Sequence, residues 1–238
     1  MRSTAYAIAL FFIATCGVAR ADLVAGWTFE PSPPTTAGPH AADLGVNAGS
    51  GSPASGFHVS GATVYDNPVG NGTAESFSSN NWAVGDYYQF RTSTTGFQGV
   101  SLSFSATSSN TGPRDFQVQY STNGTAFTPL TVGTTYSVLA NASPNLTWSS
   151  TTVRPEYSFN FNLPAALDNQ ASIFLRLVDN STVSANGMTV AAGGTSRIDT
   201  VMINAAAVPE PGAVCFGLLV CSVVGFGAAW RRYFGQQG

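Results

Sequence analysis

A few charged side chains stand inside stretches that are otherwise apolar, and they are the first candidates for chemistry. Arg176 interrupts the apolar run 173–178, while Arg197 and Asp199 lie two residues apart and would share one face of an extended strand. A charge removed from water needs a partner, because desolvation disfavours it. We therefore expect internal ion pairs between nearby acids and three arginines, Arg114, Arg176 and Arg197.

The residue types that catalysis usually needs are scarce. His40 and His58 are the two histidines, and both lie in a segment rich in Gly and Pro. The sequence contains no Gly-x-Ser-x-Gly nucleophile motif, no His-Glu-x-x-His zinc motif and no phosphate-binding glycine loop. We predict that the protein is not an enzyme. The alternative is a secreted polysaccharide hydrolase or lyase, which would need two acids facing each other in space.

Aromatic residues outside the regular strand patterns are candidates for sugar binding, because flat rings stack on the apolar faces of pyranoses. These candidates are Trp82, Tyr87, Tyr88 and Trp148. Trp82 follows two asparagines in a polar, turn-rich stretch, so we predict it as the exposed ligand-binding ring. Core packing remains the alternative for all four residues.

Charge and cysteine content exclude several classes of partner and site. Residues 22–207 contain eleven acidic residues and five arginines, a net charge of −6, which makes nucleic acid a poor partner. The three cysteines, Cys16, Cys215 and Cys221, lie in apolar segments near the two ends. Residues 22–207 therefore offer neither a disulfide framework nor a zinc cluster built on cysteine.

Alternating apolar and polar residues predict that 22–207 is an all-β domain. Strict alternation at 101–106, 115–120 and 157–163 indicates half-buried strands, and the apolar run 173–178 suits a central strand. Asn123-Gly124 predicts a tight hairpin. Further strands are expected at 23–29, 86–91, 126–130, 133–139, 146–153 and 196–204. We predict a two-sheet antiparallel sandwich, specifically a jelly roll.

Residues 31–58 differ in composition from this pattern. They contain five prolines, five glycines and few apolar anchors. We predict one long loop over a sheet edge.

The N-terminal 21 residues have the pattern of a secretory signal peptide. Arg2 supplies a positive charge, 5–16 form a short apolar stretch, and Ala19 and Ala21 are small residues at the −3 and −1 positions. Signal peptidase should therefore cleave after Ala21. A permanent anchor is the alternative, but about 12 apolar residues are too few where a bilayer needs roughly 20.

The C-terminal segment 208–238 has the pattern of a membrane anchor. Residues 212–230 are 19 residues without a charge, long enough for one transmembrane helix. Trp230 suits the interface, and Arg231 and Arg232 should remain on the cytoplasmic side of the membrane. This orientation places 22–207 outside.

A short motif precedes this run. Val208, Pro209, Glu210 and Pro211 form an extended segment, because the prolines restrict the backbone and remove amide donors. Together with the span and the arginine pair, this motif resembles the PEP-CTERM sorting signal of Gram-negative bacteria. The resemblance implies recognition by an exosortase, a membrane-embedded processing enzyme. It also implies a transient inner-membrane anchor followed by release to the cell surface or extracellular matrix.

Scattered segments of the ectodomain, at 109–116, 120–125, 174–177 and 193–199, are similar to galactose-binding and carbohydrate-binding jelly rolls. Such folds often hold a structural calcium ion between their first and last strands. The resemblance therefore implies a Ca²⁺ site with carboxylate oxygens from Glu30 and Asp199. The function we expect is a non-catalytic surface or matrix protein that binds extracellular polysaccharide, with a purely structural role as the fallback.

Overall fold

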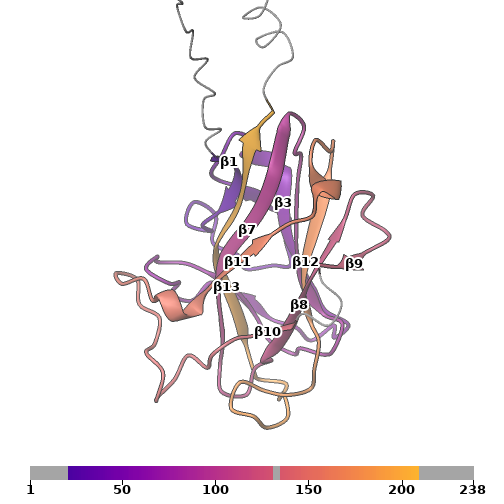
Figure 1. Cartoon of the computed structure of the whole chain (residues 1–238). Coiled ribbons are helices and arrows are strands. Elements are labelled where there is room, and N and C mark those ends of the chain that lie inside the picture. The colour runs from indigo at the N-terminus through magenta and orange to yellow at the C-terminus, as the bar shows by residue number, and fades with distance from the viewer. Residues whose placement is uncertain (1–20, 131–134, 209–238) are drawn as a thin grey trace, which may run out of the picture.

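A computed structural model describes residues 21–130 and 135–208 of the chain (Figure 1). The predicted signal segment with Ala19 and the sorting residues Pro209, Glu210, Pro211, Arg231 and Arg232 lie outside the described residues, as does the predicted span 212–230. Ala21 begins the first strand, and Val208 follows the last one with its N–H donated to the carbonyl of Gly96. Within the described ranges, no helix has the length and apolar character needed to cross a membrane.

One sheet, sheet A, is built around the last strand. Its six strands lie in the order β11-β7-β13-β5-β4, with β1 paired to β13 beside β5. Their bounds are β1 Ala21–Trp27, β4 Tyr65–Asp66, β5 Phe77–Ser79, β7 Phe97–Ser108, β11 Ser158–Asn162 and β13 Ser196–Ala207.

The other sheet, sheet B, has seven strands in the order β10-β8-β12-β6-β3-β2, with β9 paired to β8. Their bounds are β2 His40–Ala42, β3 Gly49–Phe57, β6 Tyr87–Thr92, β8 Asp115–Ser121, β9 Thr128–Pro129, β10 Thr135–Ser137 and β12 Ile173–Asp179. Short 3-10 turns, η1 Pro155–Tyr157 and η2 Ala165–Leu167, connect strands. All the named strand pairs are antiparallel, which confirms the predicted two-sheet jelly-roll sandwich.

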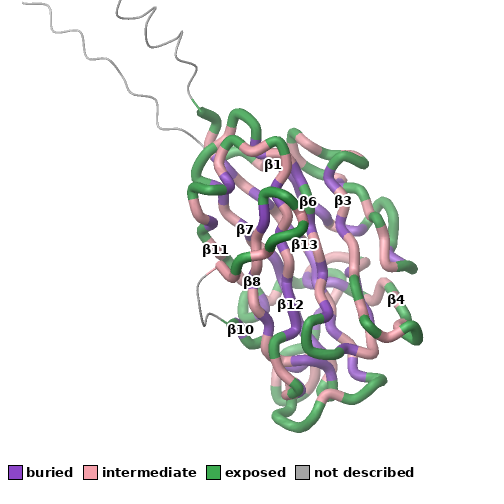
Figure 2. Tube along the Cα trace, turned by 90° about the vertical axis from the view of Figure 1, so that its right-hand side faces the viewer, coloured by how far each residue is buried: buried purple, intermediate pink, exposed green. Residues whose placement is uncertain are grey.

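The core lies between the sheets, where the buried stretches of the chain gather (Figure 2). Aromatic side chains from both sheets contribute to it. Trp27 of sheet A meets Phe90 of sheet B with ring centroids 5.1 Å apart, and Phe77 meets Tyr88 at 5.0 Å. Because successive strand residues point to opposite faces, each buried residue of sheet B leaves its neighbours on the outer side of the sheet.

Two sequence predictions about strands are wrong. Residues 31–58 are not one loop, because they contain β2 and β3, and β3 pairs with β6. The expected strand at 146–153 is absent, and that stretch has only an isolated bridge between Ser149 and Thr152.

The way the two sheets pack explains why the residues of β3 are small. A Cβ on Gly56 would stand 2.6 Å from Cε1 of Tyr65 and 3.3 Å from Cζ of Phe77. Aromatic rings of sheet A therefore fill the space that a larger residue of β3 would occupy. The strand consequently looks like a loop by composition.

Candidate functional site

The outer face of sheet B carries a regular set of polar and aromatic side chains. Buried Tyr88, Phe90, Leu175 and Leu177 alternate with partly exposed outward neighbours on β6 and β12. The strand register sets these outward residues side by side: Tyr87 lies opposite Phe57, and Gln89 lies between Ser55 and Arg176. We call this surface the outer face of sheet B and define it by Phe57, Tyr87, Gln89, Arg91, Gln117, Gln119, Phe127, Phe174 and Arg176.

Arg176 is the centre of this face. Its guanidinium carbon lies 3.9 Å from the ring centroid of Tyr87 and 3.5 Å from that of Phe127, so the cation is held between two rings. Its Nε donates a 2.9 Å hydrogen bond to Oε1 of Gln89. Burial lowers the pKa of Arg176, and the electrostatic interaction with Tyr87 partly opposes this. The guanidinium remains the charged, oriented group of the surface.

A ring and a second arginine extend the face on either side. Phe57 stacks on Tyr87 with centroids 5.0 Å apart and an interplanar angle of 16°, and it is 48% exposed. Arg91 donates a 3.1 Å hydrogen bond to Oγ of Ser172, and its guanidinium carbon lies 5.4 Å from the centroid of Phe174. The result is an open surface of ring carbon, guanidinium groups and glutamine amides.

Of the three predicted arginines, only Arg114 forms an ion pair among the described residues, and its side chain is 38% exposed, so this pair is not internal as predicted. Arg114 pairs with its neighbour Asp115 through Nε at 2.9 Å. Arg176 stacks between rings instead, and Arg197 makes no ion pair with another described residue. The prediction fails at Arg176 because two aromatic faces and an amide oxygen replace the carboxylate.

Three of the four candidate sugar-binding rings lie inside the molecule. Trp82 is 6% exposed and packs on His58, Tyr88 and Phe116, so the expectation of an exposed platform there is wrong. Its indole N–H donates to the carbonyl of Ser79 at 2.9 Å, which satisfies its polar group in the core. Tyr88 and Trp148 are buried as well.

Tyr87 alone of the four reaches the outer face of sheet B, while sequence reasoning missed Phe57, Phe127 and Gln89. The outward alternation of Tyr87, Gln89 and Arg91 along one strand was the signal available for finding this surface.

Glu30 and Asp199 both contact the segment 70–75. Asp199 is fully buried, and its Oδ2 accepts hydrogen bonds from the N–H of Asn71 at 2.8 Å and from Oγ1 of Thr73 at 2.7 Å. Its Oδ1 has no hydrogen-bond partner. Glu30 accepts the N–H of Glu75 at 2.8 Å. The predicted pair is thus gathered around one loop, although no three His, Cys, Asp or Glu residues cluster as a metal site in the described part of the chain.

Ser79, His58 and Asp86 are arranged like the nucleophile, base and orienting acid of a catalytic triad, but their side chains are buried inside the protein. Nε2 of His58 lies 3.0 Å from Oγ of Ser79, and Nδ1 lies 3.0 Å from Oδ2 of Asp86, away from the line of a straight hydrogen bond. The His58 and Asp86 side chains are 1% and 0% exposed, and the ring of Trp82 covers His58 at 4.5 Å. Burial lowers the pKa of His58, and nearby Asp86 partly opposes that. No substrate can reach Ser79, so the group acts as a structural link.

This link joins the two sheets. Oγ of Ser79 in sheet A lies 3.0 Å from the hydroxyl of Tyr88 in sheet B, and that hydroxyl donates to the carbonyl of Ser196 at 2.9 Å. Both carboxylate oxygens of Asp86 accept backbone N–H groups, those of Val59 and Ala83, at 2.8 Å. Apart from Nδ1 of His58, the buried polar atoms of this group are hydrogen-bonded, and such networks help to fix one arrangement of a core.

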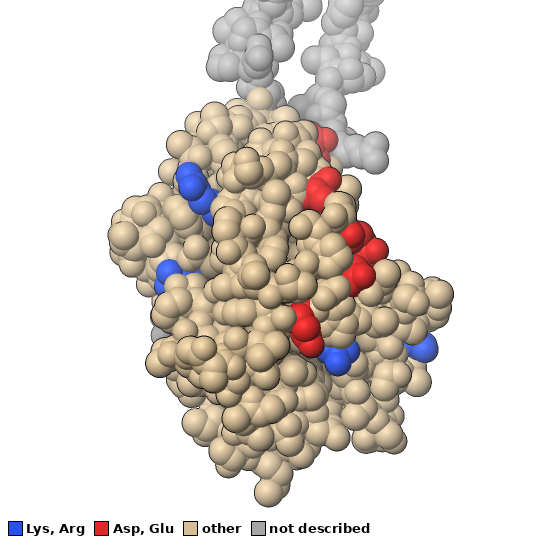
Figure 3. All heavy atoms as spheres, turned by 180° about the vertical axis from the view of Figure 1, so that it is seen from behind, with Lys and Arg blue, Asp and Glu red and all other residues tan. Residues whose placement is uncertain are grey.

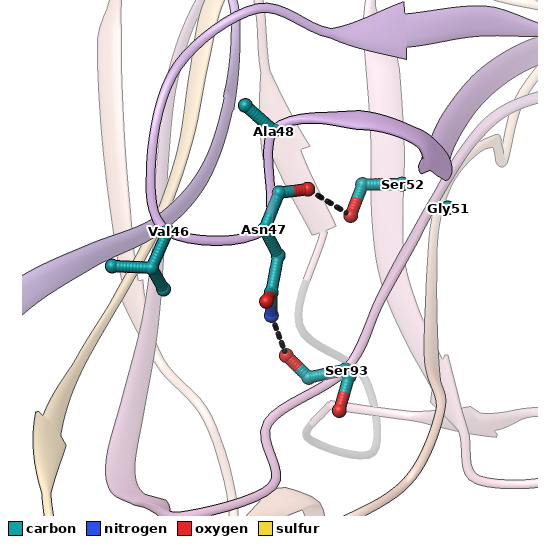
Figure 4. Close-up of a pocket in the computed structure, with 6 residues that line it drawn as sticks. All are labelled: Val46, Asn47, Ala48, Gly51, Ser52 and Ser93. Atoms are coloured by element: carbon teal, nitrogen blue, oxygen red, sulfur yellow. Dashed lines mark hydrogen bonds between the residues drawn. The ribbon is translucent and has the colours of Figure 1, made fainter.

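A separate depression of about 310 Å³ lies between the loop 46–48, β3 and Ser93 (Figure 4). The side chain of Asn47 bridges it by donating to the carbonyl of Ser93 at 2.8 Å, and Oγ of Ser52 donates to the carbonyl of Asn47 at 2.7 Å. Its lining contains no carboxylate, tyrosine or histidine. It therefore does not supply the paired acids that a glycoside-cleaving enzyme needs.

The sequence matches no family model and no curated protein. Solved structures with a similar shape include the CBM22-1 xylan-binding domain of Xyn10C from Paenibacillus barcinonensis, with a TM-score of 0.40, 13% identity, and coverage of 81% of this chain and 100% of that one. The K1 cleaved adhesin domain of Lys-gingipain from Porphyromonas gingivalis W83 has a TM-score of 0.41 and 13% identity, over 75% of this chain and 95% of that one.

The CBM22-1 and GH10 modules of Xyn10B from Clostridium thermocellum, complexed with xylohexaose, give a TM-score of 0.44 and 15% identity, over 79% of this chain and 29% of that one. At such scores and identities, these likenesses say nothing of what this chain binds.

Proposed function

We propose that the sandwich is a non-catalytic module that binds a polysaccharide chain along the outer face of sheet B. The observation that supports this is Arg176 held between Tyr87 and Phe127, with Phe57 stacked on Tyr87 and Gln89 fixing the guanidinium. Such a surface combines apolar ring area for the C–H faces of sugars with fixed donors for their hydroxyl groups. An open sheet face also suits a long chain better than a closed pocket would.

Affinity electrophoresis of the purified protein in gels that contain single polysaccharides tests this function. We expect retardation by at least one polysaccharide, and we expect Tyr87→Ala and Arg176→Ala each to weaken binding about tenfold, equivalent to about 1.4 kcal/mol. Leu146→Ala is the matched control, because Leu146 is 55% exposed and lies outside this face. Unchanged migration of the wild-type protein with every polysaccharide would contradict the proposal.

We also propose that the chain is exported and sorted by its C-terminal tail. Support comes from the sequence: the small residues Ala19 and Ala21, the motif Val208 to Pro211, the apolar run after it and the arginine pair Arg231 and Arg232. Mass spectrometry of the mature protein from a host with an exosortase should find an N-terminus at Asp22 and a C-terminus near residues 209–211. Recovery of the intact chain from the cytosol would contradict export.

A structural calcium ion at Asp199 and Glu30 is a further part of this proposal. The donor chemistry fits, because Asp199 is a buried carboxylate whose Oδ1 has no hydrogen-bond partner, and burial raises its pKa. A hard divalent cation prefers such oxygens and would balance the charge. Calcium at about 100 times its Kd should raise the melting temperature by about 5–10 °C.

Asp199→Asn should abolish this calcium response, because the substitution removes the charge and keeps the shape. Equal melting temperatures in EDTA and in millimolar calcium would dismiss the site.

A further inference from the structure

We propose that the polysaccharide recognised by the outer face of sheet B is anionic, with carboxylate groups along its chain. This inference rests on the proposed function and adds the chemical class of the ligand. It follows from the charges on the face, from the terminal nitrogens of Arg176 and from the spacing of Arg176 and Arg91.

The charge of this face is opposite in sign to that of the domain. Residues 22–207 carry more acids than arginines, yet Arg91 and Arg176 stand on the outer face of sheet B without an ion pair to any described carboxylate. Asp115, at the start of β8, is occupied by Arg114 and by the hydroxyl groups of Ser137 and Ser181. Two positive charges therefore remain unbalanced on one sheet face.

Acidic side chains gather elsewhere on the surface. In the view from behind, they form a band along the right-hand part of the molecule, while basic groups lie at the left and others lie at the lower right, below the band (Figure 3). A polyanion would be repelled by this acidic band and attracted by the unpaired Arg91 and Arg176 on the outer face of sheet B. This asymmetry gives an acidic protein a way to bind an acidic polymer in one orientation.

The geometry of Arg176 matches a carboxylate. The rings of Tyr87 and Phe127 fix the guanidinium plane, and Gln89 uses Nε. Its two terminal nitrogens donate no hydrogen bond to any other described residue. Those two N–H donors form the planar fork that binds both oxygens of a carboxylate at once, whereas a sugar hydroxyl can use only one of them.

Arg91 provides a second contact at a distance fixed by the sheet. Gln89 lies directly opposite Arg176, and Arg91 is two residues further along the same strand and on the same face. Such diagonal positions have Cα atoms roughly 7–8 Å apart. A chain that carries a carboxylate on successive sugar units can therefore reach both arginines without leaving the sheet.

Binding to polygalacturonate, compared with the same polymer after full methyl esterification, tests this inference on the full-length protein. We expect the acid form to bind at least tenfold more tightly, and we expect added salt to remove that advantage, because screening weakens attraction between exposed charges. Alginate and hyaluronate extend the carboxylated set, and neutral xylan and β-glucan serve as uncharged chains.

Three variants separate charge from shape. Arg176→Gln should remove the preference for the acid form, while Arg176→Lys should restore only part of it, because an ammonium keeps the charge and lacks the fork. Arg154→Gln is the control, because Arg154 precedes η1 and lies outside the outer face of sheet B. Unaltered circular dichroism should accompany each variant.

The outcomes distinguish the two proposals. Equal binding of the acid and ester forms, or binding confined to neutral chains, would overturn the anionic inference and leave polysaccharide binding in place. Failure to bind any polysaccharide in the set would overturn the proposed function and this inference with it.

Discussion

At the scale of single residues, Asp179 is a buried carboxyl group with little hydrogen bonding to stabilise its charged form. Its side chain is 1% exposed, its Oδ2 has no hydrogen-bond partner, and its Oδ1 accepts only a 3.4 Å contact from the N–H of Ser181. Burial raises the pKa of Asp179 to about 7, with the charges of Asp86 and Asp115 acting in the same direction. The folded protein therefore holds a proton there that the unfolded chain releases near its ordinary value of 3.8.

The sign of the pH effect follows from that shift. Because the folded-state pKa is higher than the unfolded one, the stability from this proton is complete below pH 3.8 and is lost as pH rises to about 7. His58 acts in the opposite sense, because its folded-state pKa is lowered: its contribution is present above pH 6.5 and is lost as pH falls.

Asp179→Asn isolates the first of these effects. At pH 8 we expect the variant to be more stable than the wild type by about 1–3 kcal/mol, because it removes a buried charge, and we expect this gain to vanish near pH 4. Urea denaturation at several pH values measures it. Asp66→Asn, at an exposed position, is the control and should change stability little at any pH. A variant equally or less stable at pH 8 would contradict this account.

At the scale of elements, β3 shows how packing can replace apolar character. Its inward positions are small because rings from the opposite sheet occupy the space, as at Gly56. The strand is held by its pairing with β6, in which Ala54 lies opposite Phe90 and Gly56 lies opposite Tyr88. A larger residue should therefore be harmful on one side of this strand and harmless on the other.

Gly56→Val and Gly51→Val make a matched pair in β3. We expect Gly56→Val to destabilise the protein by about 2–3 kcal/mol, because its Cβ would clash with Tyr65 and crowd Phe77. Gly51 has no heavy atom within 4 Å of its Cβ position, so Gly51→Val should be neutral or slightly stabilising. Thermal denaturation of both variants checks this, and equal losses would show that β3 packs differently.

At the scale of the whole molecule, the fold was predictable where one strand face is apolar and the other polar. The strands around 101–106, 115–120 and 157–163 were found in this way, whereas the strand at 173–178 was found from its apolar run. β3 was missed because its small residues leave space for the rings of distant residues, as at Gly56, and β2 is only three residues long.

The candidate site was predicted only in part. Of the outer face of sheet B, Tyr87 was a candidate for sugar binding and Arg176 was noted as an exceptional charge, yet their mutual stacking depends on strand register, which the sequence does not display. Trp82 looked exposed because its neighbours along the chain are polar, whereas its spatial neighbours are His58, Tyr88 and Phe116.

Removal of β13 tests how the whole domain is held together. A chain that ends at Thr195 loses the strand that pairs with β7, β5 and β1. We expect this truncated protein to lack a cooperative thermal transition and to be digested rapidly by protease, because sheet A would be divided. A folded truncated protein with a sharp melting transition would contradict this view.

The position of β13 has a consequence for the order of events during biosynthesis. β13 lies in the middle of sheet A and is the last described strand to leave the ribosome. Until it is synthesised, β7, β5 and β1 lack the strand with which they form backbone hydrogen bonds. Nascent chains of this protein should therefore lack stable tertiary structure until nearly the entire domain has been synthesised. Completion of the final strand then closes the sandwich in a single late step.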